Sequence, residues 1–142
     1  MKENYFLSIP NTVTHGRGYV YSLQYHIVWC TKYRKPILNN GLDDELKELF
    51  RELSQEYEFS IIAMEVMPDH VHLLLDCKPQ FFISDMIKIM KGNTARKLFM
   101  AHPELKKSLW GGHLWNPSYF AATVSDRTIE QINKYIEEQK VK

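Results

Sequence analysis

The stretch that decides the fold is "FSIIAMEVMPDHVHLLLDC", residues 59–77. It holds two apolar runs, 59–67 and 70–77, joined by Pro68 and Asp69. Both runs are short and rich in β-forming residues, which is typical of strands, and so tight a join predicts an antiparallel hairpin. We expect the rest of the chain to assemble around a sheet that contains this hairpin.

Two elements are predicted before the hairpin. Residues 19–31, "YVYSLQYHIVWCT", alternate between an apolar aromatic side and a polar side that includes Gln24 and His26. This period of two predicts one continuous strand. Leucines recur at helical spacing over 42–57, between charged residues suited to solvent, which predicts a helix.

Three elements are predicted after the hairpin. Residues 83–101 are expected to form a helix with Ser84 as its N-cap, and residues 119–124 a fourth strand. The last segment, 125–142, is predicted to be a helix capped by Ser125, with isoleucines along one narrow stripe.

The order of these elements predicts an α+β fold. A β-α-β-β-α-β succession is the ferredoxin-like, or RRM-like, split βαβ arrangement, with an antiparallel sheet, two helices on one face and the third strand beside the first. The C-terminal helix is an addition to it. We expect one domain over residues 19–142, preceded by an N-terminal tail or dimer arm at 1–18, which is polar and irregular.

Composition fits a single domain with one core. The chain has 142 residues, of which 44% are hydrophobic, too few for two ordinary domains. It has no apolar run of membrane-spanning length and no signal-peptide pattern, so we expect a cytoplasmic protein. Cys30 and Cys77 lie in strand-like apolar surroundings and are expected to be reduced core thiols.

Two histidines stand out in the hairpin. Residues two apart on a strand face the same way, so His70 and His72 should project side by side, about 7 Å apart, where two imidazoles can converge on one cation. Taken alone, the pattern also fits two polar residues on a solvated face. His26 would approach this pair if the first and third strands are neighbours.

A second pair lies near the C-terminus. Tyr135 and Gln139 are four residues apart on the predicted last helix and therefore share a face. If the isoleucine stripe packs on the sheet, a phenol and an amide lie along the seam between helix and sheet. The alternative is that Tyr135 only packs and Gln139 only meets solvent.

Together these segments resemble the single-tyrosine HUH transposases of the TnpA type, the insertion-sequence 200/605 group related to REP-associated tyrosine transposases. The resemblance is carried by "PDHVHLLL" and "KYIEEQ", with "GYVYSLQYHIVWCTKYRKPIL", "MEVMPDHVH" and "LWGGHLWNPSYF" as flanking blocks in the expected order. It spans about Gly18 to Gln139.

The resemblance implies a role for each motif residue. His70, His72 and Gln139 would hold a divalent metal, with Mg²⁺ as the cellular ion and Mn²⁺ able to substitute, and Tyr135 would be the nucleophile. The enzyme would cut and rejoin single-stranded DNA at element ends through a 5′-phosphotyrosine intermediate. It would bind subterminal DNA hairpins and act as a homodimer with active sites shared between subunits.

DNA contacts are expected from basic residues interleaved with aromatics, because the formal net charge of +1 requires a local patch to hold an anionic partner. The candidates are Lys32, Arg34, Lys35, Lys88, Lys91, Arg96 and Lys97.

Other functions remain open at this point. The same fold could serve as a non-catalytic or domesticated DNA-hairpin-binding module. A zinc site that recruits Cys30 or Cys77 is a further possibility, although Cys77 would face away from both histidines on a continuing strand.

Overall fold

The computed structural model describes residues 14–16, 19–21, 24–77, 82–124 and 128–139. No helix in those ranges is both long and apolar enough to cross a bilayer.

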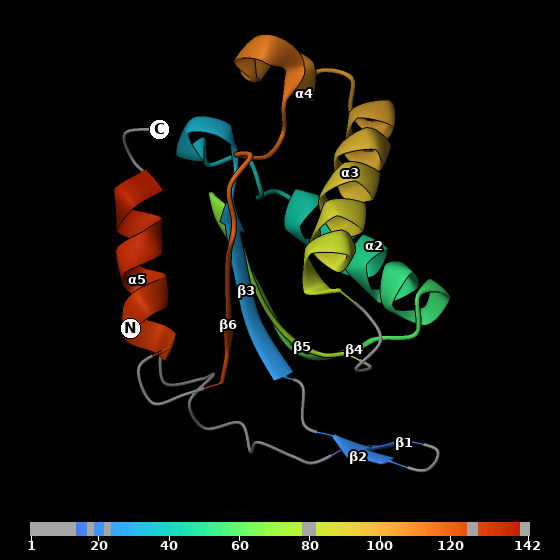
Figure 1. The fold of residues 1–142 in the computed structure, drawn as a ribbon. Coiled ribbons are helices and arrows are strands. Elements are labelled where there is room, and N and C mark those ends of the chain that lie inside the picture. The colour runs from blue at the N-terminus through green and yellow to red at the C-terminus, as the bar shows by residue number, and fades with distance from the viewer. Residues whose placement is uncertain (1–13, 17–18, 22–23, 78–81, 125–127, 140–142) are drawn as a thin grey trace.

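The centre of the fold is a four-stranded antiparallel sheet with strand order β4-β5-β3-β6 (Figure 1). Its strands are β3 (Gln24–Cys30), β4 (Ser60–Met67), β5 (His70–Asp76) and β6 (Phe120–Thr123). The third predicted strand is β5, which lies beside the first, β3, as expected. The α+β prediction is therefore confirmed.

The hairpin has the predicted position. Met67 pairs with His70 across the turn at Pro68 and Asp69, and the ladder continues through Glu65 opposite His72. Alternation along β5 sends Val71, Leu73 and Leu75 to one face, so both histidines lie on the other.

Two helices cover one face of the sheet, α2 (Leu42–Glu56) and α3 (Ile83–Ala101), as predicted. The main core lies between them and the sheet, where Trp29 is fully buried and meets Phe50 edge to face at 5.8 Å between ring centroids. Cys77 belongs to this core and, like Cys30, is a buried free thiol.

The predicted N-cap of α3 is wrong. Phe82, in extended conformation, is the cap residue, and the helix start has no side-chain capping hydrogen bond. Ser84 falls inside the first turn, because the extended backbone at Phe82 starts the helix earlier than the capping residue type suggests.

The C-terminal helix α5 (Thr128–Glu138) packs on the opposite face of the sheet (Figure 1). Ile129 and Ile132 are buried there against Val28 of β3 and Leu74 of β5. This second small core fixes α5 over the face that carries the histidines. The predicted cap Ser125 lies outside the described residues.

The strand predicted over residues 19–31 is divided. In the described residues, β5 ends at Asp76, opposite Gln24, which is the first residue of β3. Tyr19–Tyr21 forms β2 and pairs with β1 (Thr14–Gly16) in a separate two-stranded sheet. Residues 14–16, expected to be irregular, are therefore a strand.

Three short helical turns complete the described fold: η1 (Lys32–Arg34), α4 (Leu105–Ser108) and η2 (Trp110–Gly112). A bridge between Thr31 and Trp115 attaches the connection after η2 to the end of β3.

Candidate active site

His70 is oriented by a carboxylate. Its Nδ1 lies 2.8 Å from Asp69 Oδ1, while Asp69 Oδ2 accepts hydrogen bonds from Arg34 Nε at 2.9 Å and Nη2 at 2.8 Å. Burial by itself would raise the pKa of Asp69, but hydrogen bonds from His70 and Arg34 hold that pKa below its usual value. An imidazole that donates from Nδ1 to a carboxylate keeps its Nε2 lone pair for another partner.

His72 is buried and held beside a third histidine. Its Nε2 lies 2.8 Å from His26 Nδ1, across the β3–β5 ladder. Burial, reinforced by His26 and His70 nearby, lowers the pKa of His72 to about 3, so the ring is neutral. The approach of His26, expected if the two strands are neighbours, is confirmed.

Tyr135 and Gln139 meet at one hydroxyl. The Tyr135 oxygen lies 2.8 Å from Ser118 Oγ, and Ser118 Oγ lies 3.3 Å from Gln139 Oε1. Tyr135 also packs its ring on Phe120, with 6.0 Å between centroids. Burial raises the pKa of Tyr135, and the Ser118 hydrogen bond acts against that rise. Gln139 is only 4% exposed, which excludes a solvated residue.

Hydrogen bonds to Lys91 and Cys30 fix the segment that contains Ser118. Lys91 Nζ donates to the Asn116 carbonyl at 2.6 Å and to the Ser118 carbonyl at 3.1 Å, and Asn116 N donates to Cys30 O at 2.9 Å. Burial lowers the pKa of Lys91 to about 8. These bonds anchor the segment to α3 and to β3.

Arg34 connects the two halves of the site. The guanidinium that binds Asp69 also donates from Nη1 to the Ile136 carbonyl, at 3.2 Å, in the last turn of α5. The last turn of α5, which carries Tyr135 and is followed directly by Gln139, therefore lies near the turn that precedes His70. The described bonds of Tyr135 and Gln139 go to Ser118, and those of the histidines go to Asp69 and to His26.

The residues that could hold a divalent cation are of mixed type. No group of three His, Cys, Asp or Glu side chains is placed to hold a metal within the described part of the chain. The buried amide of Gln139 is a candidate donor beside His70 and His72. His72 can offer Nδ1 while it donates from Nε2 to His26, which is one of its two neutral tautomers.

A zinc site with cysteine is poorly supported. Cys77 lies in the main core, on the far face of the sheet from the histidines. Cys30 lies opposite His70 in the β3–β5 ladder, and burial raises the pKa of its thiol to about 11.

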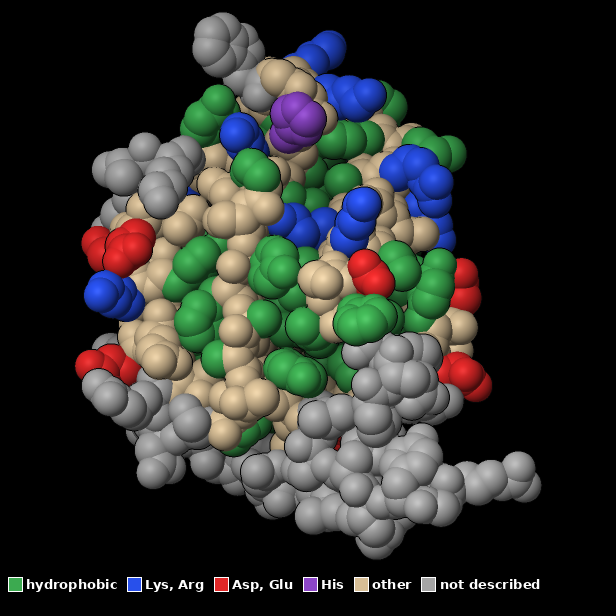
Figure 2. Space-filling view, viewed as in Figure 1, with side chains coloured by type: hydrophobic (Ala, Val, Ile, Leu, Met, Phe, Trp, Pro, Cys, Tyr) green, Lys and Arg blue, Asp and Glu red, His purple; other side chains and the backbone are tan. Residues whose placement is uncertain are grey.

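Six of the seven predicted DNA-contacting residues divide into two groups, and the seventh, Lys32, has its Nζ 5.0 Å from the centroid of the Tyr33 ring. Arg34, Lys35 and Lys91 are engaged within the chain, Lys35 by donating to the Ser108 carbonyl at 2.6 Å. The exposed members on α3 are Lys88, Arg96 and Lys97. Figure 2 shows most basic side chains of the displayed face in its upper half.

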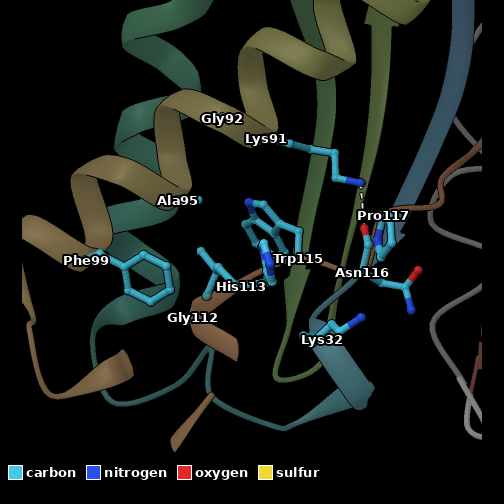
Figure 3. Close-up of a pocket in the computed structure, with 11 residues that line it drawn as sticks. Lys32, Lys91, Gly92, Ala95, Phe99, Gly112, His113, Trp115, Asn116 and Pro117 are labelled. Carbon is cyan, nitrogen blue, oxygen red and sulfur yellow. Dashed lines mark hydrogen bonds between the residues drawn. The ribbon is translucent and has the colours of Figure 1, made fainter. Parts of the chain in front are cut away.

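A pocket lies between α3 and the segment after η2 (Figure 3). Its volume is about 360 Å³, and its lining includes Lys32, Lys91, Phe99, His113 and Trp115. Trp115 Nε1 donates to Thr94 Oγ1 at 3.2 Å, which fixes the indole in the wall. Aromatic rings beside ammonium groups suit a nucleotide.

Asp69, Asn116 and Ser118 are site residues that were not predicted from the sequence. The role of Asp69 could have been inferred from its position directly before His70. Ser118 gave no signal, because its partners are 17 and 21 residues away in the chain.

Comparisons with known proteins agree with these observations. Residues 19–139 match the sequence profile of the family described as "Transposase IS200 like". The ISDra2 transposase TnpA of Deinococcus radiodurans is 51% identical over 134 residues, which cover 94% of this chain and 96% of the relative. The transposase for insertion sequence element IS200 of Salmonella typhimurium is 27% identical over 119 residues, 84% of this chain and 78% of that one.

Solved structures agree on the fold. A crystal structure from Deinococcus radiodurans superposes with a TM-score of 0.84 at 50% identity, over 89% of this chain and 97% of that chain. A REP-associated tyrosine transposase bound to a REP hairpin superposes with a TM-score of 0.56 at 12% identity, over 91% and 76% of the two chains.

Proposed function

Because the chain belongs to the family of IS200-like transposases and is a transposase, we propose that it cuts and rejoins single-stranded DNA through Tyr135. The observation that carries this proposal is the position of the last turn of α5. It lies on the face of the sheet that holds His70 and His72, and Arg34 ties it to the turn that orients His70.

The chemistry is a transesterification. The Tyr135 oxygen attacks a backbone phosphorus, forms a new O–P bond and displaces the 3′ oxygen, which leaves as a hydroxyl. The product is a 5′-phosphotyrosine, and attack by a 3′-hydroxyl reverses the step on a new strand. One phosphate ester replaces another, so the reaction needs no external energy source. A phenol has a pKa near 10, so the nucleophile requires a site that favours loss of its proton.

His70, His72 and Gln139 are the residues that would hold a divalent cation. The bound ion would neutralise charge on the phosphate in the transition state. Two neutral imidazoles and an amide add no negative charge to it. Mg²⁺ is the ion we expect in the cell, and the nitrogen ligands favour Mn²⁺ as a substitute.

DNA-hairpin binding is proposed for the basic surface of α3. Lys88, Arg96 and Lys97 are exposed there and suit phosphate contacts. A homodimer with shared active sites stays a prediction. In the chain described, α5 packs on its own sheet.

The test is a cleavage assay on labelled single-stranded DNA that carries element-end hairpins, with Mg²⁺ or Mn²⁺. The parent should form a covalent protein–DNA band, and Tyr135→Phe should not. Tyr119→Phe is the matched control, because Tyr119 is 40% exposed and close in sequence to Ser118. A parent that binds the hairpin but never forms the band, with either ion, would favour a non-catalytic hairpin-binding module.

A further inference from the structure

Ser118 stands where three other polar groups of the site meet. Its Oγ lies 2.8 Å from the Tyr135 hydroxyl, 3.0 Å from Asn116 Oδ1 and 3.3 Å from Gln139 Oε1. Two of these neighbours are the predicted nucleophile and a predicted metal ligand. Ser118 therefore contacts both the predicted nucleophile and a predicted metal ligand.

The Ser118 hydroxyl can donate only one hydrogen bond at a time. A serine hydroxyl has one hydrogen to donate, and amide oxygens can only accept. While that hydrogen points to Asn116 Oδ1 or Gln139 Oε1, the Tyr135 hydroxyl must donate to Ser118 Oγ. If Tyr135 loses its proton, the same hydroxyl can rotate and donate to the phenolate.

We infer that Ser118 is a positioning residue for the nucleophile, which holds the Tyr135 phenol in the resting site and donates to its oxygen as that oxygen loses its proton. The inference rests on the proposed function, since it takes Tyr135 as the attacking group. Gln139 competes for the same hydrogen. When Gln139 directs its oxygen to a cation instead, one competing acceptor is removed and donation to Tyr135 becomes easier.

The proton and bond balance is complete without a further reactant. The phenol proton goes to solvent, one O–P bond forms at Tyr135, one O–P bond to the 3′ oxygen breaks, and that oxygen takes a proton from solvent. Ser118 gains and loses no proton in this step, because an aliphatic hydroxyl is too weak a base to keep one. Its contribution is a hydrogen bond that stabilises the negative charge on the Tyr135 oxygen after the proton leaves and before the O–P bond forms.

The surroundings of Ser118 support a fixed donor. Lys91 binds the carbonyls of Asn116 and Ser118, and Asn116 Oδ1 also accepts from Ser118 N at 3.0 Å. The backbone is thus held while the hydroxyl remains able to rotate. Burial raises the pKa of Tyr135, and the Ser118 hydrogen bond opposes part of that rise.

The experiment compares Ser118→Ala, Ser118→Thr and a matched control, Ser108→Ala. Ser108 also loses one neutral hydrogen bond, from its Oγ to the Leu105 carbonyl at 3.0 Å, but belongs to α4. We measure the single-turnover rate of covalent adduct formation at saturating hairpin DNA and the Kd for that DNA. Because the phenolate oxygen loses charge as its bond to phosphorus forms, removing a hydrogen-bond donor to it should cost about tenfold in rate.

We expect Ser118→Ala to slow adduct formation about tenfold, with the DNA Kd unchanged within about twofold. Ser118→Thr, which keeps the hydroxyl, should regain most of the rate, and Ser108→Ala should match the parent. Hydrogen exchange of α5 in metal-free protein gives a readout independent of activity. The amides of its last turn should exchange faster in Ser118→Ala than in Ser118→Thr.

Two failures can be told apart. If the parent forms no adduct, or Tyr135→Phe still does, the proposed function fails. If the parent and Tyr135→Phe behave as expected but Ser118→Ala reacts as fast as the parent, this inference alone is overturned. It is also overturned if Ser118→Ala loses DNA binding in proportion to rate, or if Ser118→Thr is as slow as Ser118→Ala, because either result indicates a purely structural role.

Discussion

The contacts of Arg34 should stabilise the fold more than an exposed ion pair such as Arg51–Glu48, because they join η1, the turn before β5 and α5. Arg34 binds Asp69 with two nitrogens and the Ile136 carbonyl with a third. We therefore expect Arg34→Ala to lower the free energy of unfolding by about 3 kcal/mol.

The magnitude follows from burial and bond type. The Arg34 and Asp69 side chains are 18% and 20% exposed, so their ion pair is largely shielded from solvent. Breaking a fully buried pair costs about 3–5 kcal/mol, and partial exposure reduces this to about 2 kcal/mol. The lost bond to the Ile136 carbonyl adds about 1 kcal/mol.

Backbone conformation gives a second expectation at the same position. Arg34 has φ of 53°, in the left-handed region, and so does its neighbour Tyr33 at 59°. Glycine adopts this conformation without the cost of about 1 kcal/mol that alanine meets. Arg34→Gly should therefore be less destabilising than Arg34→Ala by about 1 kcal/mol, the reverse of the usual order.

The assay is equilibrium urea unfolding followed by circular dichroism at pH 7, with a double-mutant cycle between Arg34→Ala and Asp69→Ala. The control is Arg51→Ala, because Arg51 pairs with Glu48 at side-chain exposures of 55% and 63% and should cost less than about 0.5 kcal/mol. The reasoning is refuted if Arg34→Ala costs no more than this control, or if the two effects in the cycle simply add.

Three further outcomes are expected. Ile132→Ala should lower the free energy of unfolding by about 2–3 kcal/mol in urea titrations, because Ile132 is 3% exposed in the contact of α5 with the sheet; exposed Glu130→Ala should cost little, and equal effects would contradict the packing. His26→Ala should weaken Mn²⁺ binding about tenfold in calorimetric titrations, because His26 orients His72; an unchanged Kd would exclude that role. Lys91 has a folded pKa of about 8, below its unfolded value, so the charge on its half-buried side chain costs stability fully below pH 8 and less as pH rises; the stability of the parent relative to Lys91→Met should therefore increase from pH 8 to pH 10, and a flat difference would refute the shift.

Local patterns predicted most of the fold. The helix at 83–101 and the hairpin around Pro68 and Asp69 were predicted at the positions where they occur, because periodicity and turn residues act over a few neighbours. Pairing of β3 with β5 then brought His26 to His72. The division of the first strand could not be predicted, because it depends on which strands its two parts pair with.

The hydrogen bonds between polar residues of the site could not be predicted from local sequence patterns. Arg34 meets Asp69 across 35 positions and Ile136 across 102, and no spacing rule covers such distances. Arg34 and Lys91 were predicted to contact DNA because they are charged. In the structure they donate hydrogen bonds to oxygen atoms of the chain itself. Basic residues beside aromatics indicate a patch without showing which charges remain exposed.

Mass spectrometry of the covalent adduct identifies the residue that attacks the DNA. The adduct formed on single-stranded DNA with Mn²⁺ is digested and the DNA-bearing peptide is sequenced. The account predicts attachment at Tyr135 through the 5′ phosphate of the downstream fragment. Attachment at the more exposed Tyr33 or Tyr119, or through a 3′ phosphate, would contradict it.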